Sequence, residues 1–93
     1  MTIGLLRIEF MIPGAGSLKE KRSLMKRMKH RVRKEFNVAV AEMENLNNFS
    51  RGQLGFTTLS NDGQLPKKIL VKVEEYIDKH FNIIVTDRLI ETF

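Results

Sequence analysis

Positively charged side chains are concentrated in one segment of the chain, from Ser17 to Phe36. This segment holds nine of the sixteen Lys and Arg residues and only two acidic residues, Glu20 and Glu35, so its formal charge is +7. The rest of the chain has seven basic and nine acidic residues and a formal charge of −2. A cationic segment on a mildly acidic protein is typical of a surface that binds a polyanion, because such binding releases the counterions condensed on the partner.

Helical spacing arranges most of these cations in two rows. Side chains three or four residues apart stack along one side of an α-helix, where like charges destabilise the helix by roughly 0.2–0.5 kcal/mol per pair. Stability alone therefore does not favour this arrangement, whereas phosphate groups would neutralise it. The first row comprises Lys19, Arg22, Lys26, Lys29 and Arg33. The second row comprises Arg27, Arg31 and Lys34.

We predict that this helix contacts the phosphate backbone of structured RNA or of the ribosome. The alternatives are a solvated face that keeps the protein soluble, and a membrane surface or an acidic protein as the partner. Insertion into a bilayer is disfavoured because the apolar side of the helix is needed for the core. The predicted nucleic-acid-binding residues are Lys19, Lys21, Arg22, Lys26, Arg27, Lys29, Arg33 and Lys34.

A second candidate site precedes this helix. Gly14, Gly16 and Ser17 lie where the helix begins, and the free N–H groups and the dipole of a helix N-terminus can hold an anion. The pattern is not a Walker loop, and the third glycine of a dinucleotide-binding fingerprint is absent. A plain turn between a strand and a helix explains the same residues, so an anion site is the alternative interpretation.

Few residues in this sequence could support catalysis. His30 and His80 fall on the expected helices as surface or capping residues, and no serine has a companion base at a suitable spacing. Glu42 and Glu44 could form a carboxylate pair for metal binding or acid–base catalysis, or they could solvate a strand and pair with arginines. Without cysteine, neither a disulfide nor a thiolate metal site can form. We expect no catalytic residue, no metal and no cofactor.

The hydrophobic pattern predicts the elements that position these residues. Period-2 alternation and apolar runs predict strands at 2–12, 38–44, 53–60 and 82–91, and apolar residues at helical spacing predict helices at 17–36 and 65–80. Ser17 and Glu20 have the form of a capping box at the start of the first helix. The order β-α-β-β-α-β predicts one ferredoxin-like α+β domain over residues 1–93, with two helices on one face of a four-stranded antiparallel sheet.

The opposite face of this sheet has no helix to cover it. Strands carry apolar residues on both faces, as at Val38 and Val40 opposite Ala39 and Ala41, and exposed apolar patches usually mark an interface. We therefore expect a homodimer formed through the open sheet face. A partly apolar open face without a partner, or a different partner, are the alternatives.

The open sheet also offers a second way to bind RNA. An RNA recognition motif stacks bases on aromatic residues of its two central strands. Residues 51–56 echo the signature of that motif, but Gln53 and Gly55 stand where aromatic residues are needed. The stacking platform is therefore missing, and we expect Phe56 to pack in the core or against another chain.

The sequence gives no signal for a membrane span or for secretion. No apolar run approaches the ~20 residues that a transmembrane helix needs. The first residues contain neither a basic region nor a cleavable apolar segment. We therefore expect a cytoplasmic protein.

Several blocks of this sequence resemble a known family. The blocks are Ser17–Ser23, Phe36–Glu42, Leu54-Gly55 and Ser60–Asp62. Over nearly the whole chain they resemble the YlxP-like family of small uncharacterised bacterial proteins. The resemblance implies a ferredoxin-like fold and a cytosolic bacterial setting, often encoded beside transcription-termination, translation-initiation and ribosome-maturation factors. That neighbourhood favours RNA or the ribosome as the partner.

The resemblance carries over no catalytic residue, because no activity is established for the family. Relatives tend to have an Asp and then a Trp in the central loop, where this chain has Asn47 and Phe49. The basic helix is therefore the best shared candidate. We predict a small non-catalytic binding protein that associates with RNA or the ribosome. The alternative is a homodimeric protein–protein interaction module with a merely solvated basic helix, and a small-anion sensor or enzyme is a third hypothesis.

Overall fold

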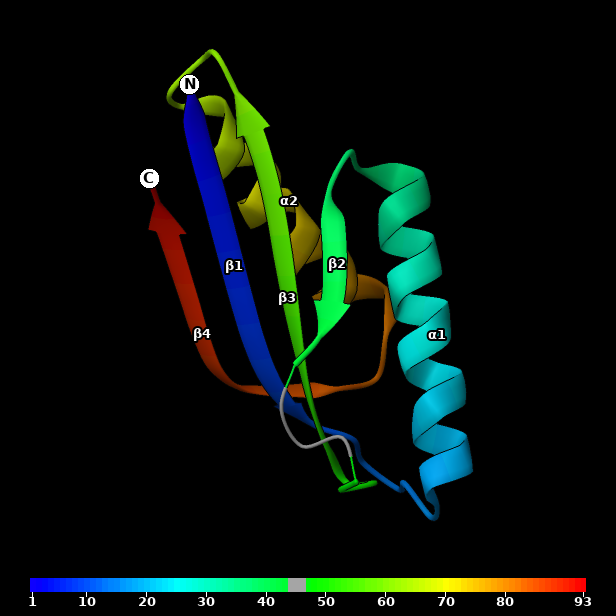
Figure 1. Cartoon of the computed structure of the whole chain (residues 1–93). Helices are drawn as coiled ribbons and strands as arrows, with labels where there is room; N and C mark the ends of the chain where they lie inside the picture. Colours follow the sequence, from blue (N-terminus) through cyan, green and yellow to red (C-terminus); the bar gives the residue numbers. More distant parts are fainter. Residues whose placement is uncertain (44–46) are drawn as a thin grey trace.

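Six elements follow one another in the computed structural model, which describes residues 1–43 and 47–93. They are β1 (Thr2–Met11), α1 (Leu18–Glu35), β2 (Ala39–Glu42), β3 (Arg51–Ser60), α2 (Leu65–His80) and β4 (Ile84–Thr92) (Figure 1). The predicted order β-α-β-β-α-β is confirmed. The second strand is shorter than predicted, and Glu44, which the prediction included in it, lies outside the described residues.

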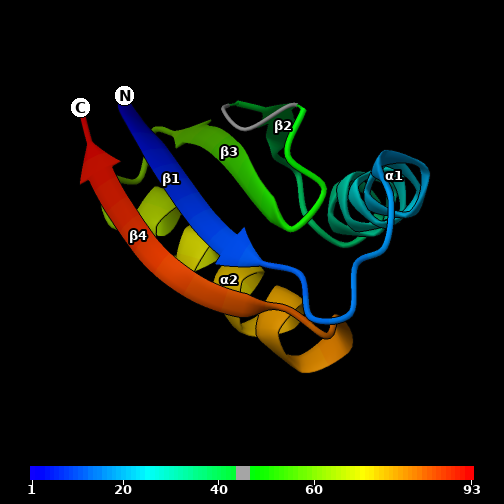
Figure 2. The ribbon, with the colours of Figure 1, turned by 90° about the horizontal axis from the view of Figure 1, so that it is seen from below.

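The four strands form one antiparallel sheet in the order β2-β3-β1-β4. β1 pairs with β3 along its whole length on one side and with β4 on the other. Its first residues reach the end of the chain, where Ile3 and Phe93 exchange backbone hydrogen bonds of 2.9 and 2.8 Å. The sheet curves over α2, and α1 lies beyond the edge strand β2 (Figure 2). The predicted ferredoxin-like α+β fold is confirmed.

One face of the sheet and the inner sides of both helices form the core. Leu6, Ile8 and Phe10 alternate along β1 and are fully buried, and Leu54 and Phe56 of β3 face the same way. The helices contribute Met25, Met28, Val32, Leu70, Val73 and Ile77 to this core. Phe56 is only 1% exposed, so it belongs to the core of this chain and not to an interface.

Two glycines let the helices lie close to the sheet. A Cβ atom on Gly4 of β1 would lie 2.8 Å from Leu70 Cδ1 of α2. A Cβ atom on Gly52 of β3 would lie 2.7 Å from the Phe10 ring and 3.3 Å from Met25 Cε of α1. Both helices therefore pack on the same face of the sheet. They lie so close to it that any side chain larger than that of glycine at Gly4 or Gly52 would clash.

Local hydrogen bonds begin α1 where the sequence predicts. Ser17 has an extended backbone, and its Oγ accepts a 3.1 Å hydrogen bond from the Glu20 N–H. The Glu20 carboxylate in turn accepts a 2.9 Å hydrogen bond from the Gly16 N–H, so the capping box reaches back one residue further than the usual form. Within the described parts of the chain, no helix is long and apolar enough to cross a membrane.

Candidate nucleic-acid interface

α1 runs along one border of the molecule, next to the edge strand β2 (Figures 1 and 2). Its inner side buries Met25, Met28 and Val32, and its opposite side faces solvent. Because each residue turns the helix by about 100°, these buried residues fix the direction of every cation on α1. Of the eight predicted nucleic-acid-binding residues, all except Lys21 and Lys29 are exposed.

Two cations on the side of α1 that adjoins β2 are held by that strand. Lys29 Nζ lies 3.4 Å from Glu42 Oε2, and Arg33 Nη2 donates to the Val40 carbonyl oxygen at 3.0 Å. A partly exposed ion pair of this kind contributes about 0–1 kcal/mol to stability. Lys29 is thereby compensated by an acid, whereas Arg33 meets a neutral carbonyl and keeps its charge.

On the side of α1 that adjoins α2, one arginine is held by aromatic rings. The Arg31 guanidinium lies 5.7 Å from the centre of the Tyr76 ring and 5.2 Å from that of Phe81. These cation–π contacts orient the side chain without compensating its charge. Arg31 was not among the predicted site residues, although it belongs to the second row and its exposure qualifies it.

The remaining cations of α1 are exposed, and no acidic side chain among residues 1–43 and 47–93 pairs with them. They are Lys19, Arg22, Lys26, Arg27 and Lys34. We call these five, together with Arg31 and Arg33, the basic face of α1. Its seven positive charges lie on a helix of 18 residues, which is about 27 Å long.

Lys21 does not belong to this face. Its side chain is 1% exposed on the inner side of α1, and its Nζ donates to the Asn48 carbonyl oxygen at 2.7 Å. Burial lowers the pKa of this ammonium group, while Glu42 acts in the opposite direction. The structure therefore removes Lys21 from the predicted RNA-contacting surface. The sequence held a signal for this burial. Lys21 precedes Met25 by four positions and Met28 by seven, and residues at these spacings lie on the same side of a helix.

The loop before α1 uses its N–H groups within the chain. The Gly16 N–H donates to the Glu20 carboxylate, which already lies at the helix N-terminus where an anion would bind. Gly14 adopts a left-handed φ of +72°, as a tight turn requires. The predicted anion site at Gly14, Gly16 and Ser17 gains no support from this geometry, and a plain turn accounts for it.

The described residues considered for catalysis lie on three different elements, α1, α2 and β2. His30 is exposed on α1, and the His80 ring at the end of α2 packs 4.3 Å from that of Tyr76. Glu42 pairs with Lys29, and its predicted companion Glu44 lies outside the described residues. In the part of the chain that the structure describes, no three His, Asp or Glu side chains gather as a metal site requires.

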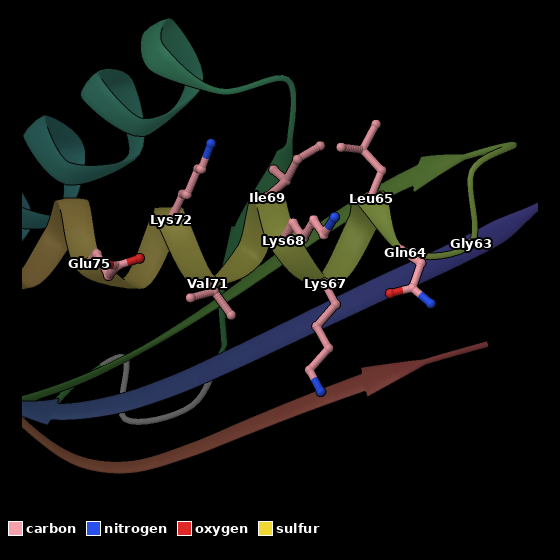
Figure 3. Close-up of a pocket in the computed structure, with 9 residues that line it drawn as sticks. All are labelled: Gly63, Gln64, Leu65, Lys67, Lys68, Ile69, Val71, Lys72 and Glu75. Atoms are coloured by element: carbon pink, nitrogen blue, oxygen red, sulfur yellow. The ribbon is translucent and has the colours of Figure 1, made fainter.

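A hollow of about 670 Å³ follows the outer side of α2 (Figure 3). All nine lining residues come from the single segment 63–75. Leu65, Ile69 and Lys72 point to one side of the helix, whereas Lys67 and Val71 point to the other. Ligand sites need polar groups that converge, so this hollow is the uneven surface of one helix.

The open face of the sheet has no aromatic platform on β3. Side chains alternate along β3, and Leu54 and Phe56 point into the core. Gln53 and Gly55 therefore lie on the open face. A shallow hollow of about 190 Å³ lies beside Gly55 and Met43, lined mainly by apolar and small side chains. They include Leu5, Ala39, Ala41, Met43 and Thr57. In the central loop, Asn47 and Phe49 are both exposed.

Comparison with known proteins assigns this chain to a family. Residues 3–89 match the model of a family described as "Protein of unknown function (DUF503)". The chain belongs to this family. A relative in Bacillus subtilis (strain 168), "Uncharacterized protein YlxP", is 37% identical over 76 residues, which are 82% of this chain and 83% of that protein. The predicted resemblance to the YlxP-like family is confirmed.

A designed protein shares the architecture of this DUF503 member. The chain is similar to "De novo designed protein Foldit4", with a TM-score of 0.52, 17% sequence identity, and coverage of 99% of this chain and 94% of that one. At this identity the likeness concerns the fold alone. None of these descriptions names a function, so a function has to be argued from the surface of the molecule.

Proposed function

We propose that this chain is a small, cytoplasmic, non-catalytic protein that binds structured RNA, including that of the ribosome, through the basic face of α1. One observation carries the proposal. α1 presents seven exposed cations, and none of them pairs with an acidic side chain within the described residues. Two predicted nucleic-acid-binding residues lie outside this face and hold α1 in position. Lys29 pairs with Glu42, and Lys21 donates to the Asn48 carbonyl oxygen.

Electrostatics favour an anionic partner for this face. Like charges at helical spacing repel one another, and no acidic side chain among residues 1–43 and 47–93 gives them the compensation of an ion pair. A phosphate backbone would supply it, and each phosphate that is neutralised releases condensed counterions, so affinity falls steeply with salt. Phosphate contacts carry no sequence information, so the shape of the RNA would determine the target.

The proposal predicts that removing cations from α1 lowers the affinity for RNA more than removing the same number elsewhere. We would titrate labelled fragments of bacterial ribosomal RNA by fluorescence anisotropy at two salt concentrations, with wild type and a Lys26→Gln/Arg27→Gln/Lys34→Gln variant. Loss of three phosphate contacts lowers the salt slope by about three and the affinity at moderate salt by roughly 100-fold or more.

A matched control exists on α2. The Lys67→Gln/Lys68→Gln/Lys72→Gln variant removes the same charge from exposed positions of the other helix, and we expect it to retain nearly wild-type affinity. Equally weak binding by all three proteins would show that the basic face only keeps the molecule soluble. Equal losses in both variants would mean that net charge, and not α1, determines binding.

A second candidate function is a homodimeric interaction module that uses the open sheet face. The observation that favours it is the shallow apolar hollow at Ala39, Ala41 and Gly55, where the small side chains leave room for side chains of a second sheet. Met43 and Leu89 leave 41% and 37% of their surface exposed at the same face. α1 is packed on the other face of the sheet, so both functions are compatible in one molecule.

A further inference from the structure

Most cations of the basic face lie on two sides of the outermost line of α1, which we call the ridge. Ser23 and His30 are exposed and lie on the line opposite the buried Met28 and Val32. Lys19 continues this ridge at the start of α1. The row on the β2 side of the ridge comprises Arg22, Lys26 and Arg33. The row on the α2 side comprises Arg27, Arg31 and Lys34.

Contacts within the molecule fix the direction of each row. Arg33 reaches the Val40 carbonyl of β2, and Arg31 lies over Tyr76 of α2. At about 100° per residue, the centres of the two rows are about 125° apart around the helix axis. Three cations therefore point to each side, with a hydroxyl and an imidazole between them. Among the described elements, none lies at the outer side of α1 in either view (Figures 1 and 2).

Two opposed rows of cations match two phosphate backbones. A single strand has one backbone and would engage one row at a time. The deep groove of a regular A-form duplex is too narrow for protein side chains to read, and an α-helix with its side chains is about 10–12 Å wide. A helix of that width fits a groove of about 12 Å, the width of the B-form major groove.

We infer that α1 lies lengthwise in the deep groove of an RNA double helix that a bulge or internal loop has widened, with one row of cations against each backbone. This inference rests on the proposed function. Ser23 and His30 then face the base edges, where a hydroxyl and an imidazole can both donate and accept hydrogen bonds. The ridge then supplies the contacts that depend on the base sequence of the RNA, and the two rows supply most of the affinity through the phosphate backbones.

The test compares three RNAs of one length: a duplex with an internal loop, a perfect duplex, and a single strand. We expect the looped duplex to bind at least tenfold more tightly than the other two. Arg22→Gln/Lys26→Gln and Arg27→Gln/Lys34→Gln each remove two cations from one row. Both variants should lose affinity to a similar degree, and each should lower the salt slope by about two. His30→Ala, which removes both the donor and the acceptor, should reduce the preference for the looped duplex without changing the slope.

The failures of the two proposals are distinguishable. If the single strand or the perfect duplex binds as tightly as the looped duplex, the groove model is wrong while RNA binding stands. The same holds if only one row affects affinity. If none of the three RNAs binds in a salt-dependent way, the proposed function fails as well. Circular dichroism of each variant verifies that all substitutions, which are on exposed positions of α1, leave the fold intact.

Discussion

Lys21 is a charged residue whose role is structural. Its methylene groups lie on the buried side of α1, and the ammonium group reaches out to the Asn48 carbonyl. Asn48 in turn accepts hydrogen bonds of 3.0 and 2.9 Å from the Ser50 N–H and hydroxyl. The lysine therefore connects α1 to the loop that leads into β3, which explains why a cation occupies the apolar side of the helix.

The burial of Lys21 predicts a change of stability with pH. Its folded-state pKa lies below the usual 10.5, so in alkaline solution the folded protein loses this proton before the unfolded chain does. The unfolded state then binds more protons, and the free energy of unfolding rises with pH up to that value. A Lys21→Met variant lacks this rise. At neutral pH it should be within about 1 kcal/mol of wild type or more stable, because a buried charge is replaced by an apolar group of similar volume.

Urea unfolding at neutral and alkaline pH checks this prediction. Lys26→Met is the matched control, since it removes the same charge from an exposed position of α1 and should keep the alkaline rise. A loss of more than about 2 kcal/mol at neutral pH in Lys21→Met, as expected for an essential buried hydrogen bond, would show that the bond to Asn48 outweighs the cost of burial.

At the scale of elements, local signals were sufficient for α1 but not for β2. The capping box and the apolar spacing lie within the helix itself, and the predicted range 17–36 agrees closely with Leu18–Glu35. β2 spans Ala39–Glu42, shorter than the predicted 38–44, because the extent of a strand depends on its pairing with β3. Likewise, spacing predicted the rows of cations, but only the packing of α1 decides that Arg31 and Arg33 are held by neighbours.

Repulsion on the basic face predicts that neutralising it stabilises the fold. The Lys26→Gln/Arg27→Gln/Lys34→Gln variant removes several like-charge pairs at helical spacing, each worth roughly 0.2–0.5 kcal/mol. At low salt we therefore expect it to exceed the unfolding free energy of wild type by about 1 kcal/mol. The difference should shrink in about 1 M salt, where the Debye length is about 3 Å.

Chemical denaturation at the two salt concentrations measures this difference. The α2 variant Lys67→Gln/Lys68→Gln/Lys72→Gln serves as the reference, because Glu75 stands one turn from Lys72 and balances part of the repulsion there. A basic-face variant that is less stable than wild type at low salt would contradict the prediction and would indicate that these cations stabilise α1.

For the molecule as a whole, the two proposed surfaces lie on different parts of the fold. The sequence predicted a cationic segment and an uncovered sheet face, and both are present. It did not predict how the open face is composed, since this depends on strand register. Glu9 and Arg51 form a 3.6 Å ion pair on it, while the apolar hollow is lined mainly by residues of β2 and β3. A dimer interface would therefore be centred on β2 and β3.

The second candidate function predicts that the chain dimerises through this hollow. Sedimentation equilibrium should show a dimer at micromolar concentrations and a monomer for Ala41→Arg, because the new side chain would fill the hollow with a charge. Val71→Arg, at an exposed position on α2, should remain dimeric. A wild-type protein that is monomeric throughout this range would rule out the interface.

The position of β1 between β3 and β4 has a consequence for biosynthesis. Among the described elements, β1 is synthesised before the others and its partner β4 after them. Until Ile84–Thr92 emerges from the exit tunnel, one side of β1 has unpaired backbone N–H and C=O groups that a neighbouring nascent chain could occupy. Contacts so distant along a chain also form slowly. The pairing of β4 with β1 therefore has to wait until the described elements between them have been synthesised.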